Sequence, residues 1–271
     1  MLSSIVRRLS YLTALLYAIV GAALFILPGQ MAPVFAWNVT PFMAMTIGAW
    51  CLGNTWLAWI SARRGEWRLV YSALFYLGLF GTLQVGVVVA FADKLRLAHP
   101  IAWVYLAALA VNVIAFLAGA GEWLRNRPAG TASGPSPTKA HRIELAAFTL
   151  FVGGLGIYAL VEQSGGLGTN GGIFPELMSL FTLRSFGAFY LALSLGMLPL
   201  FADRSMATWM HHGFASSGFL VTILSATFVN IGLFDFAESS GGLLYIGVYL
   251  FVGVTLLFIL IKGGTGKRAT T

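Results

Sequence analysis

The chain has little charge. Asp, Glu, Lys and Arg make up 9% of its 271 residues, against about 25% in an average soluble domain. Hydrophobic residues make up 58%, which is more apolar surface than a soluble protein of this size can hide from water. This composition excludes an ordinary soluble protein and favours one whose surface faces hydrocarbon.

Cysteine and catalytic motifs are also scarce. Cys51 is the single cysteine, which excludes an intrachain disulfide and a CxxC redox pair. The sequence contains no HExxH, GxSxG or P-loop pattern. The histidines (His99, His141, His211 and His212) lie outside the middle of the apolar runs, which argues against a haem held between two helices. A surface metal site on the last three lacks supporting cysteines or carboxylates. We therefore expect no catalytic residue, no bound metal and no cofactor.

Eight continuous apolar runs fill most of the chain. Each is close to the roughly 20 residues that a helix needs to cross a bilayer. They cover residues 11–28, 41–60, 69–92, 101–124, 144–161, 183–202, 213–234 and 242–261. The runs do not alternate between apolar and polar residues as barrel strands do. The sequence therefore predicts an all-α, polytopic membrane protein with eight transmembrane helices.

Basic residues gather on one side of these predicted spans. The richer side holds thirteen: Arg7, Arg8, Arg63, Arg64, Arg68, Arg125, Arg127, Lys139, Arg142, Arg204, Lys262, Lys267 and Arg268. The other side holds Lys94, Arg96 and Arg184. The positive-inside rule then places both termini in the cytoplasm. The basic residues lie near helix ends, where they meet anionic headgroups, so we expect membrane lipids as partners and no nucleic acid. A bacterial cytoplasmic membrane fits this pattern.

The chain divides into two similar halves. Residues 128–141 are rich in Pro, Gly, Ser and Thr and predict a flexible cytoplasmic linker between a first module, residues 1–127, and a second, residues 142–271. Matching residues occur in the same order in both: Gly48 with Gly187, Trp67 with Trp209, Asp93 with Asp235, and Tyr105 with Tyr249. Four spans per half make the two repeats parallel.

Glycine is frequent within and between the apolar runs. Nine glycines are expected to let helices approach closely: Gly21, Gly48, Gly53, Gly78, Gly81, Gly154, Gly156, Gly187 and Gly247. The glycine-rich segment 164–182 predicts a mobile outer loop. In the corresponding loop of the first half, Trp37 is placed for the interfacial aromatic belt.

Three amide side chains lie within the predicted spans, where polar residues usually face the bundle interior. Asn54, Gln84 and Asn112 lie at similar depth on three helices of the first module, so we expect them to meet. Hydrogen bonding between helices is the favoured role. A polar contact in a ligand cavity is the alternative.

Charges near the outer boundary of the second module form a second candidate group. Arg184, Glu162, Glu176 and Asp235 lie there, with Asn230 slightly deeper. A bridge between Arg184 and a carboxylate would tie helices together. The alternative is an outward-facing pocket in which Arg184 binds an anionic headgroup or carboxylate.

Two segments carry a family resemblance. YAIVGAALFILP, residues 17–28, has a glycine near the centre of the first helix and a proline at its outer end, and LRSFGAFYLALSLG, residues 183–196, follows the plan of a second helix. Together they resemble the DoxX-like group of small four-helix membrane proteins, here in tandem. That resemblance implies an accessory membrane protein, with some members linked to quinone or thiol redox systems. The lone Cys51 gives the thiol chemistry no support.

The leading functional hypothesis is a non-enzymatic membrane protein. It would act as an accessory subunit, or would bind a lipid, a quinone or a similar amphiphile, within a larger membrane complex or a homo-oligomer. A transporter of a small solute or lipid is the first alternative. A membrane redox enzyme is the second.

Overall fold

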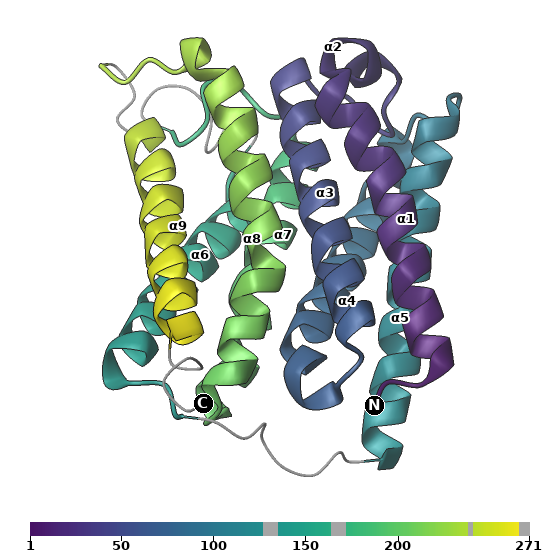
Figure 1. Cartoon of the computed structure of the whole chain (residues 1–271). Coiled ribbons are helices and arrows are strands. Elements are labelled where there is room, and N and C mark those ends of the chain that lie inside the picture. The colour runs from purple at the N-terminus through teal and green to yellow at the C-terminus, as the bar shows by residue number, and fades with distance from the viewer. Residues whose placement is uncertain (127–134, 164–171, 238–240, 266–271) are drawn as a thin grey trace.

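A computed structural model describes residues 1–126, 135–163, 172–237 and 241–265, and these ranges contain helices and no strand (Figure 1). The eight long helices among them have 23 to 27 residues. They are α1 (Ser4–Ile26), α3 (Pro41–Arg64), α4 (Trp67–Ala90), α5 (Pro100–Asn126), α6 (Lys139–Val161), α7 (Leu180–Ala202), α8 (Met206–Val229) and α9 (Gly241–Thr265). Short helices α2 (Pro28–Met31), η1 (Ala32–Val34), η2 (Ala92–Lys94) and η3 (Ile231–Leu233) lie in the connections between α1 and α3, α4 and α5, and α8 and α9.

Several long helices extend beyond the apolar runs because capping residues set their first turns. The side chain of Ser3 accepts a hydrogen bond from the Val6 N–H, so α1 begins seven residues before its apolar run. Thr138 forms a capping box with His141, and α6 therefore begins at Lys139. Hydropathy locates the span, but a polar cap decides where the helix starts.

Six of the described helices are long and apolar enough to cross a membrane: α1, α4, α5, α6, α7 and α8. The described apolar stretch of α9, Gly241–Val254, is shorter. Helix α3 is not among the six, and it is also the helix with the most buried residues. A helix enclosed by protein need not be uniformly apolar, since its polar groups do not meet lipid. The class of protein expected from composition, a helical membrane protein, is thus supported by its structure.

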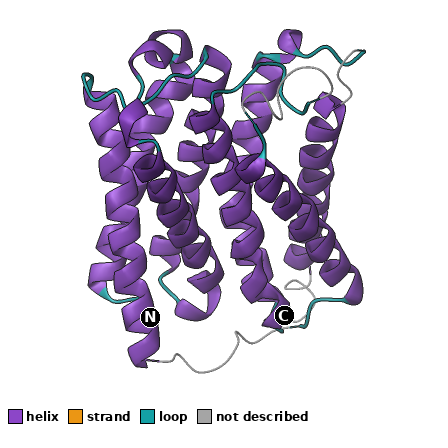
Figure 2. Cartoon of the chain, turned by 180° about the vertical axis from the view of Figure 1, so that it is seen from behind, coloured by secondary structure: helices purple, strands orange, loops and turns teal. Residues whose placement is uncertain are grey.

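The two halves pack through their second and third helices. Helix α3 contacts α8, and α4 contacts α7, while α1 packs on α3 and α6 packs on α7. The connections gather at the two ends of the bundle (Figure 2). The start of α1 and the end of α9 lie at the same end (Figure 1).

The contacts between α1 and α3 have counterparts between α6 and α7. The Arg7 Nε donates to the Ala62 carbonyl, and the Arg142 Nη1 donates to that of Phe201. Three further contacts between α1 and α3 have a counterpart between α6 and α7. The Thr55–Ala14 contact corresponds to Ser194–Thr149. The Gly21–Leu52 contact corresponds to Gly156–Leu191, and Gly48–Phe25 corresponds to Gly187–Leu160. In all four pairs, the α6 residue lies 135 positions after its counterpart and the α7 residue 139 positions after its own.

Close helix approach at glycine is confirmed at seven of the nine expected positions. A Cβ atom on Gly156 would lie 2.7 Å from the Leu191 N, and one on Gly48 would lie 2.7 Å from the Phe25 N. Gly154 and Gly247 have no atom of the described residues within 4 Å of such an atom. For those two, the expectation of close contact is wrong.

The expected linker is only partly described. Residues 128–134 lie outside the described ranges, as do residues 164–171 of the predicted outer loop and the basic residues Lys267 and Arg268. Within the described part, the Pro135 carbonyl accepts a bond from the Met206 N–H at 2.8 Å. The predicted linker therefore ends at Thr138, three residues earlier than expected.

Candidate functional site

Arg184 caps a helix rather than pairing with a carboxylate. Its Nη1 donates to the Ala159 carbonyl and to the Glu162 carbonyl, both at 2.8 Å. Among the described residues no Arg184–carboxylate ion pair forms, so the expected bridge is wrong. The last turn of α6 leaves carbonyls without intrahelical donors, and a cation is favourable at that end of a helix. Arg184 thus joins α7 to α6.

Replacing Arg184 by methionine is expected to lower the free energy of unfolding by about 1 kcal/mol, because two carbonyls lose a charged donor that water partly replaces. Arg184→Lys should recover part of this loss, since it keeps a charged donor but its ammonium is more strongly hydrated than a guanidinium. Thermal unfolding of the purified protein in detergent measures both. Equal stability of all three proteins would contradict the capping role.

The carboxylates of the other outer residues form no ion pair with Arg184 among the described residues. The Glu162 carboxylate accepts a bond from the Gln163 N–H at 2.7 Å. Its pKa is lowered first by that bond, then by the Tyr158 hydroxyl, with a smaller contribution from the Arg184 charge. Glu176 accepts a bond from the Thr40 hydroxyl, which caps α3.

The remaining two outer residues are held within the α8–α9 connection. The Asp235 Oδ1 accepts from the Ala237 N–H at 3.0 Å. The Asn230 side chain donates to the Ala226 carbonyl at 2.8 Å and to the Met45 sulfur at 3.3 Å. The Asp235 bond is local, whereas the Met45 contact of Asn230 joins the end of α8 to α3. Neither of the two cavities described below includes any of the five outer residues.

Trp37 is buried instead of lying in an interfacial belt. Its side chain is 1% exposed and its Nε1 donates to the Thr182 hydroxyl at 3.1 Å. Its ring stacks on Phe181 with 4.3 Å between centroids. The belt expectation is wrong because the first outer loop folds onto the start of α7 and links the two halves.

The three in-membrane amides are buried, as expected, but each has a different environment. The Asn112 Nδ2 donates to the Tyr17 hydroxyl at 3.0 Å and to the Leu77 carbonyl at 2.9 Å. The Gln84 Nε2 donates to the Ser185 carbonyl at 2.8 Å and so joins α4 to α7. Neither polar atom of Asn54 has a partner among the described residues. The expected meeting of the three amides is therefore wrong.

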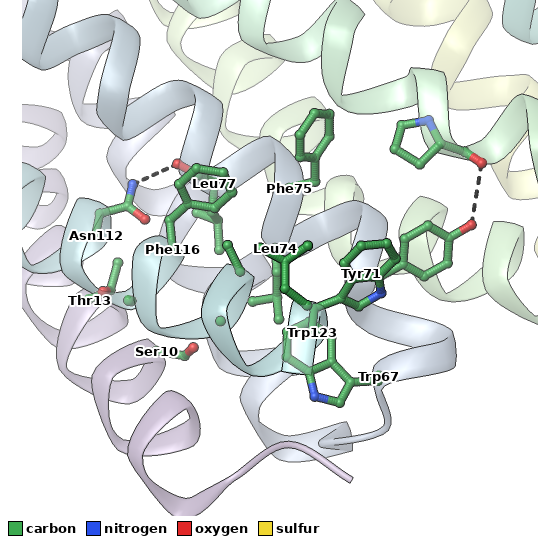
Figure 3. Close-up of a pocket in the computed structure, with 15 residues that line it drawn as sticks. Ser10, Thr13, Trp67, Tyr71, Leu74, Phe75, Leu77, Asn112, Phe116 and Trp123 are labelled. Atoms are coloured by element: carbon green, nitrogen blue, oxygen red, sulfur yellow. Dashed lines mark hydrogen bonds between the residues drawn. The ribbon is translucent and has the colours of Figure 1, made fainter. Parts of the chain in front are cut away.

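The first cavity lies among α1, α4 and α5, with Pro199 of α7 at its edge (Figure 3). It has a volume of about 440 Å³ and is partly open, within the range of about 300–1,000 Å³ typical of small-molecule sites. Its lining includes Ser10, Thr13, Trp67, Tyr71, Asn112 and Trp123. Asn112 is the only predicted site residue that lines either cavity.

Polar groups hold the wall of this cavity in place. The Trp67 Nε1 donates to a Glu122 carboxylate oxygen at 2.8 Å, and the same oxygen accepts from the Ser3 N–H at 2.9 Å. The Tyr71 hydroxyl donates to the buried Asp203 carboxylate at 2.8 Å. Asp203 also accepts from the Ser205 N–H at 2.6 Å, so the α7–α8 turn is tied to the first module.

The second cavity lies among α6, α7, α8 and α9 and has a volume of about 350 Å³. Its lining runs from His141 and Glu144 at one end of the bundle to Ile173 in the outer connection. Tyr190 and Tyr245 are among its aromatic residues. Such a long, partly open and mainly apolar groove is suited to an extended hydrocarbon chain.

The two cavities occupy corresponding places in the two halves. Residues of α6 lie 135 positions after their α1 counterparts, those of α8 lie 142 after α4, and those of α9 lie 144 after α5. In this register the lining residues pair as Ser10 with Leu145, Thr13 with Phe148, Trp67 with Trp209, Tyr71 with Gly213, Leu77 with Phe219, and Asn112 with Leu256. Sequence reasoning used Trp67 and Trp209 as markers of a repeat but missed that both line cavities.

The sequence also contains no sign that His212 joins two helices. Its Nδ1 lies 2.6 Å from the Ser72 Oγ, in a buried hydrogen bond that joins α8 to α4. His212 is buried in this contact. It is therefore not available as a ligand for the surface metal site with His141 and His211 that was considered above.

Comparison of the chain with protein-family models, with curated proteins and with solved structures finds no match.

Proposed function

We propose that this chain is an eight-span protein of the bacterial cytoplasmic membrane, built from two parallel four-helix repeats with both termini in the cytoplasm. We further propose that it binds an amphiphile, of the lipid or quinone class, as an accessory rather than a catalytic protein. The resemblance to DoxX-like proteins stays part of this proposal.

Matched contacts support the two repeats. Four pairs of contacts keep one register between α1–α3 and α6–α7. Spans α3 and α9 complete the count of eight, since α3 is enclosed by protein and the described part of α9 is strongly apolar. The excess of basic residues at the end of the bundle where α1 begins supports the orientation.

The observation that carries the binding proposal is a partly open, mainly apolar cavity at corresponding places in the two halves. Each has polar groups toward the end where α1 and α6 begin, with Trp67 and Glu122 beside one and His141 and Glu144 beside the other. An amphiphile fits such a cavity, because its chain leaves water while its polar part meets polar side chains.

Binding is tested by purifying the protein from its native membrane and identifying retained amphiphiles by native mass spectrometry. Ala120→Phe and Ser216→Phe add bulk to the first and second cavity, respectively. Ala110→Phe and Val221→Phe are matched controls on exposed faces of the same helices. We expect retention to fall only in the first two variants. A wild-type protein that retains no amphiphile beyond the bulk lipid mixture would overturn the proposal.

Orientation is tested with a membrane-impermeant maleimide. The single cysteine, Cys51, is buried, so the folded native protein should not react, which makes it a clean background. We expect Arg96→Cys to react from outside intact cells and Arg8→Cys to react only after the membrane is opened. The reverse pattern would contradict the proposed orientation.

A further inference from the structure

The first cavity contains two polar groups whose bonding is incomplete. The Thr13 side chain is 1% exposed, lines the cavity, and has no hydrogen-bond partner for its hydroxyl among the described residues. A buried hydroxyl without a partner costs about 1–3 kcal/mol, so its presence needs an explanation.

Asn112 of α5 lies on the same side of the cavity as Thr13 of α1 (Figure 3). Its Nδ2 donates to the Tyr17 hydroxyl, and Tyr17 follows Thr13 by four residues on the same face of α1. Both donated bonds of Asn112 come from Nδ2. Its Oδ1 accepts no bond within the described part of the chain, although Asn112 also lines the cavity.

These two groups are complementary to a hydroxyl. Thr13 donates and accepts, whereas the Asn112 Oδ1 only accepts. A ligand hydroxyl can accept from Thr13 and donate to Asn112 at once, but a carbonyl can only accept. We propose that the first cavity binds an apolar alcohol or phenol whose hydroxyl lies between Thr13 and Asn112.

The size and opening of the cavity suit such a molecule. A volume of about 440 Å³ admits a chain or ring system of lipid-like size. Trp123, 46% exposed, and Leu124, 63% exposed, line its open side, so a ligand can enter from the surrounding hydrocarbon. Figure 3 shows Thr13 and Asn112 on the same side of the cavity, away from Trp67 and Trp123.

The second cavity provides an internal comparison. At the positions that correspond to Thr13 and Asn112 it has Phe148 and Leu256, which offer no hydrogen bond. The Thr13–Asn112 arrangement is therefore not repeated in the second cavity, where the lining group without a partner among the described residues is the Trp209 Nε1, which can only donate. This inference rests on the proposed function, since both need a ligand in the cavity.

The test uses a dodecanol that carries a photoreactive diazirine, with the labelled segments identified by mass spectrometry in the full-length protein. We expect labelling of α1, α4 and α5. Unlabelled 1-dodecanol should compete about three- to tenfold better than dodecane, as one net hydrogen bond implies, and 2-dodecanone should fall between them. Each competitor partitions into detergent to the same extent whichever variant is present. The ratio of competition by dodecanol to competition by dodecane can therefore be compared between variants.

Thr13→Val is the decisive variant, because it removes the hydroxyl while nearly keeping the shape. The preference for dodecanol over dodecane should fall, because only the Asn112 Oδ1 then remains to bind the hydroxyl, with no loss of thermal stability. Thr149→Val is the matched control, since the Thr149 hydroxyl is also buried without a partner but lines neither cavity; it should keep the preference.

The outcomes separate the two proposals. Labelling of the first cavity with equal competition by alcohol and alkane, or with the preference kept in Thr13→Val, overturns this inference and leaves amphiphile binding in place. Failure of any probe to label either cavity in the wild-type protein overturns both.

Discussion

Replacing Gly156 by leucine is expected to separate α6 from α7 and to lower the free energy of unfolding by about 3 kcal/mol or more, at the upper end of overpacking costs. A Cβ atom there would lie 2.7 Å from the Leu191 N and 3.2 Å from the Gly187 carbonyl oxygen. Both are backbone atoms, so no side-chain rotation relieves the clash. Unfolding by SDS titration or heat in mild detergent measures the loss.

The same helix contains a matched control. Gly154 has no atom of the described residues within 4 Å of an added Cβ, and leucine has the higher helix propensity. Gly154→Leu should therefore be neutral or slightly stabilising. Gly21→Leu should resemble Gly156→Leu, because an added Cβ would lie 2.9 Å from the Leu52 N. If Gly156→Leu were as stable as Gly154→Leu, the tight α6–α7 contact would be wrong.

The helices and their order follow from the sequence because hydropathy is a local property. The apolar runs that end at residues 161 and 202 end with α6 (Lys139–Val161) and α7 (Leu180–Ala202). The prediction of close packing at glycine is confirmed where a partner helix faces the glycine, and it is wrong at Gly154 and Gly247. A glycine in an apolar run thus predicts tolerance of close approach, and the packing decides whether it is used.

Side-chain partners were harder to predict because sequence gives depth in the membrane but not rotation about the helix axis. Asn112 and Gln84 lie at similar depth, yet one faces Tyr17 within the first module and the other faces Ser185 across the interface. Arg184 was expected to find a carboxylate, because charges attract, but the nearest acceptors were the last carbonyls of α6. Free carbonyls at a helix end have no sequence signature of their own.

The cavities could not be predicted because they depend on volumes left between helices from different parts of the chain. Trp67 and Trp209 were visible as matching residues, but their shared role appears only when α4 and α8 are seen in place. Thr13 carried no signal, since threonine is common in membrane helices and usually bonds to the preceding turn. Its lack of a partner is a property of the packed structure.

Replacing Asn54 is expected to have the second large effect on the free energy of unfolding, an increase where Gly156→Leu gives a decrease. The Asn54 side chain is 0% exposed, and neither its Oδ1 nor its Nδ2 has a partner among the described residues. Leucine has the same branched skeleton without polar atoms. Asn54→Leu is therefore expected to raise the free energy of unfolding by about 2 kcal/mol, the cost of a buried unsatisfied group, as measured by SDS titration or thermal unfolding.

The same substitution at Asn112 is the matched comparison. Asn112→Leu removes the donor to Tyr17 and to the Leu77 carbonyl, so it should lower stability by about 1 kcal/mol, in line with hydrogen bonds measured between membrane helices. Opposite signs at two amides of similar depth would confirm that partners, and not depth, decide their effect.

A bound water is the competing explanation for Asn54. The Tyr76 hydroxyl lies near enough to Asn54 for a weak hydrogen bond, although the geometry of a formed bond is not met and neither group has another partner among the described residues. Were a water to bridge the two groups, Asn54→Leu would destabilise, and its effect would not add to that of Tyr76→Phe. We expect instead that each single variant stabilises, because each removes an unsatisfied group; since the two groups are neighbours, the sign of each single variant is the test and not their sum.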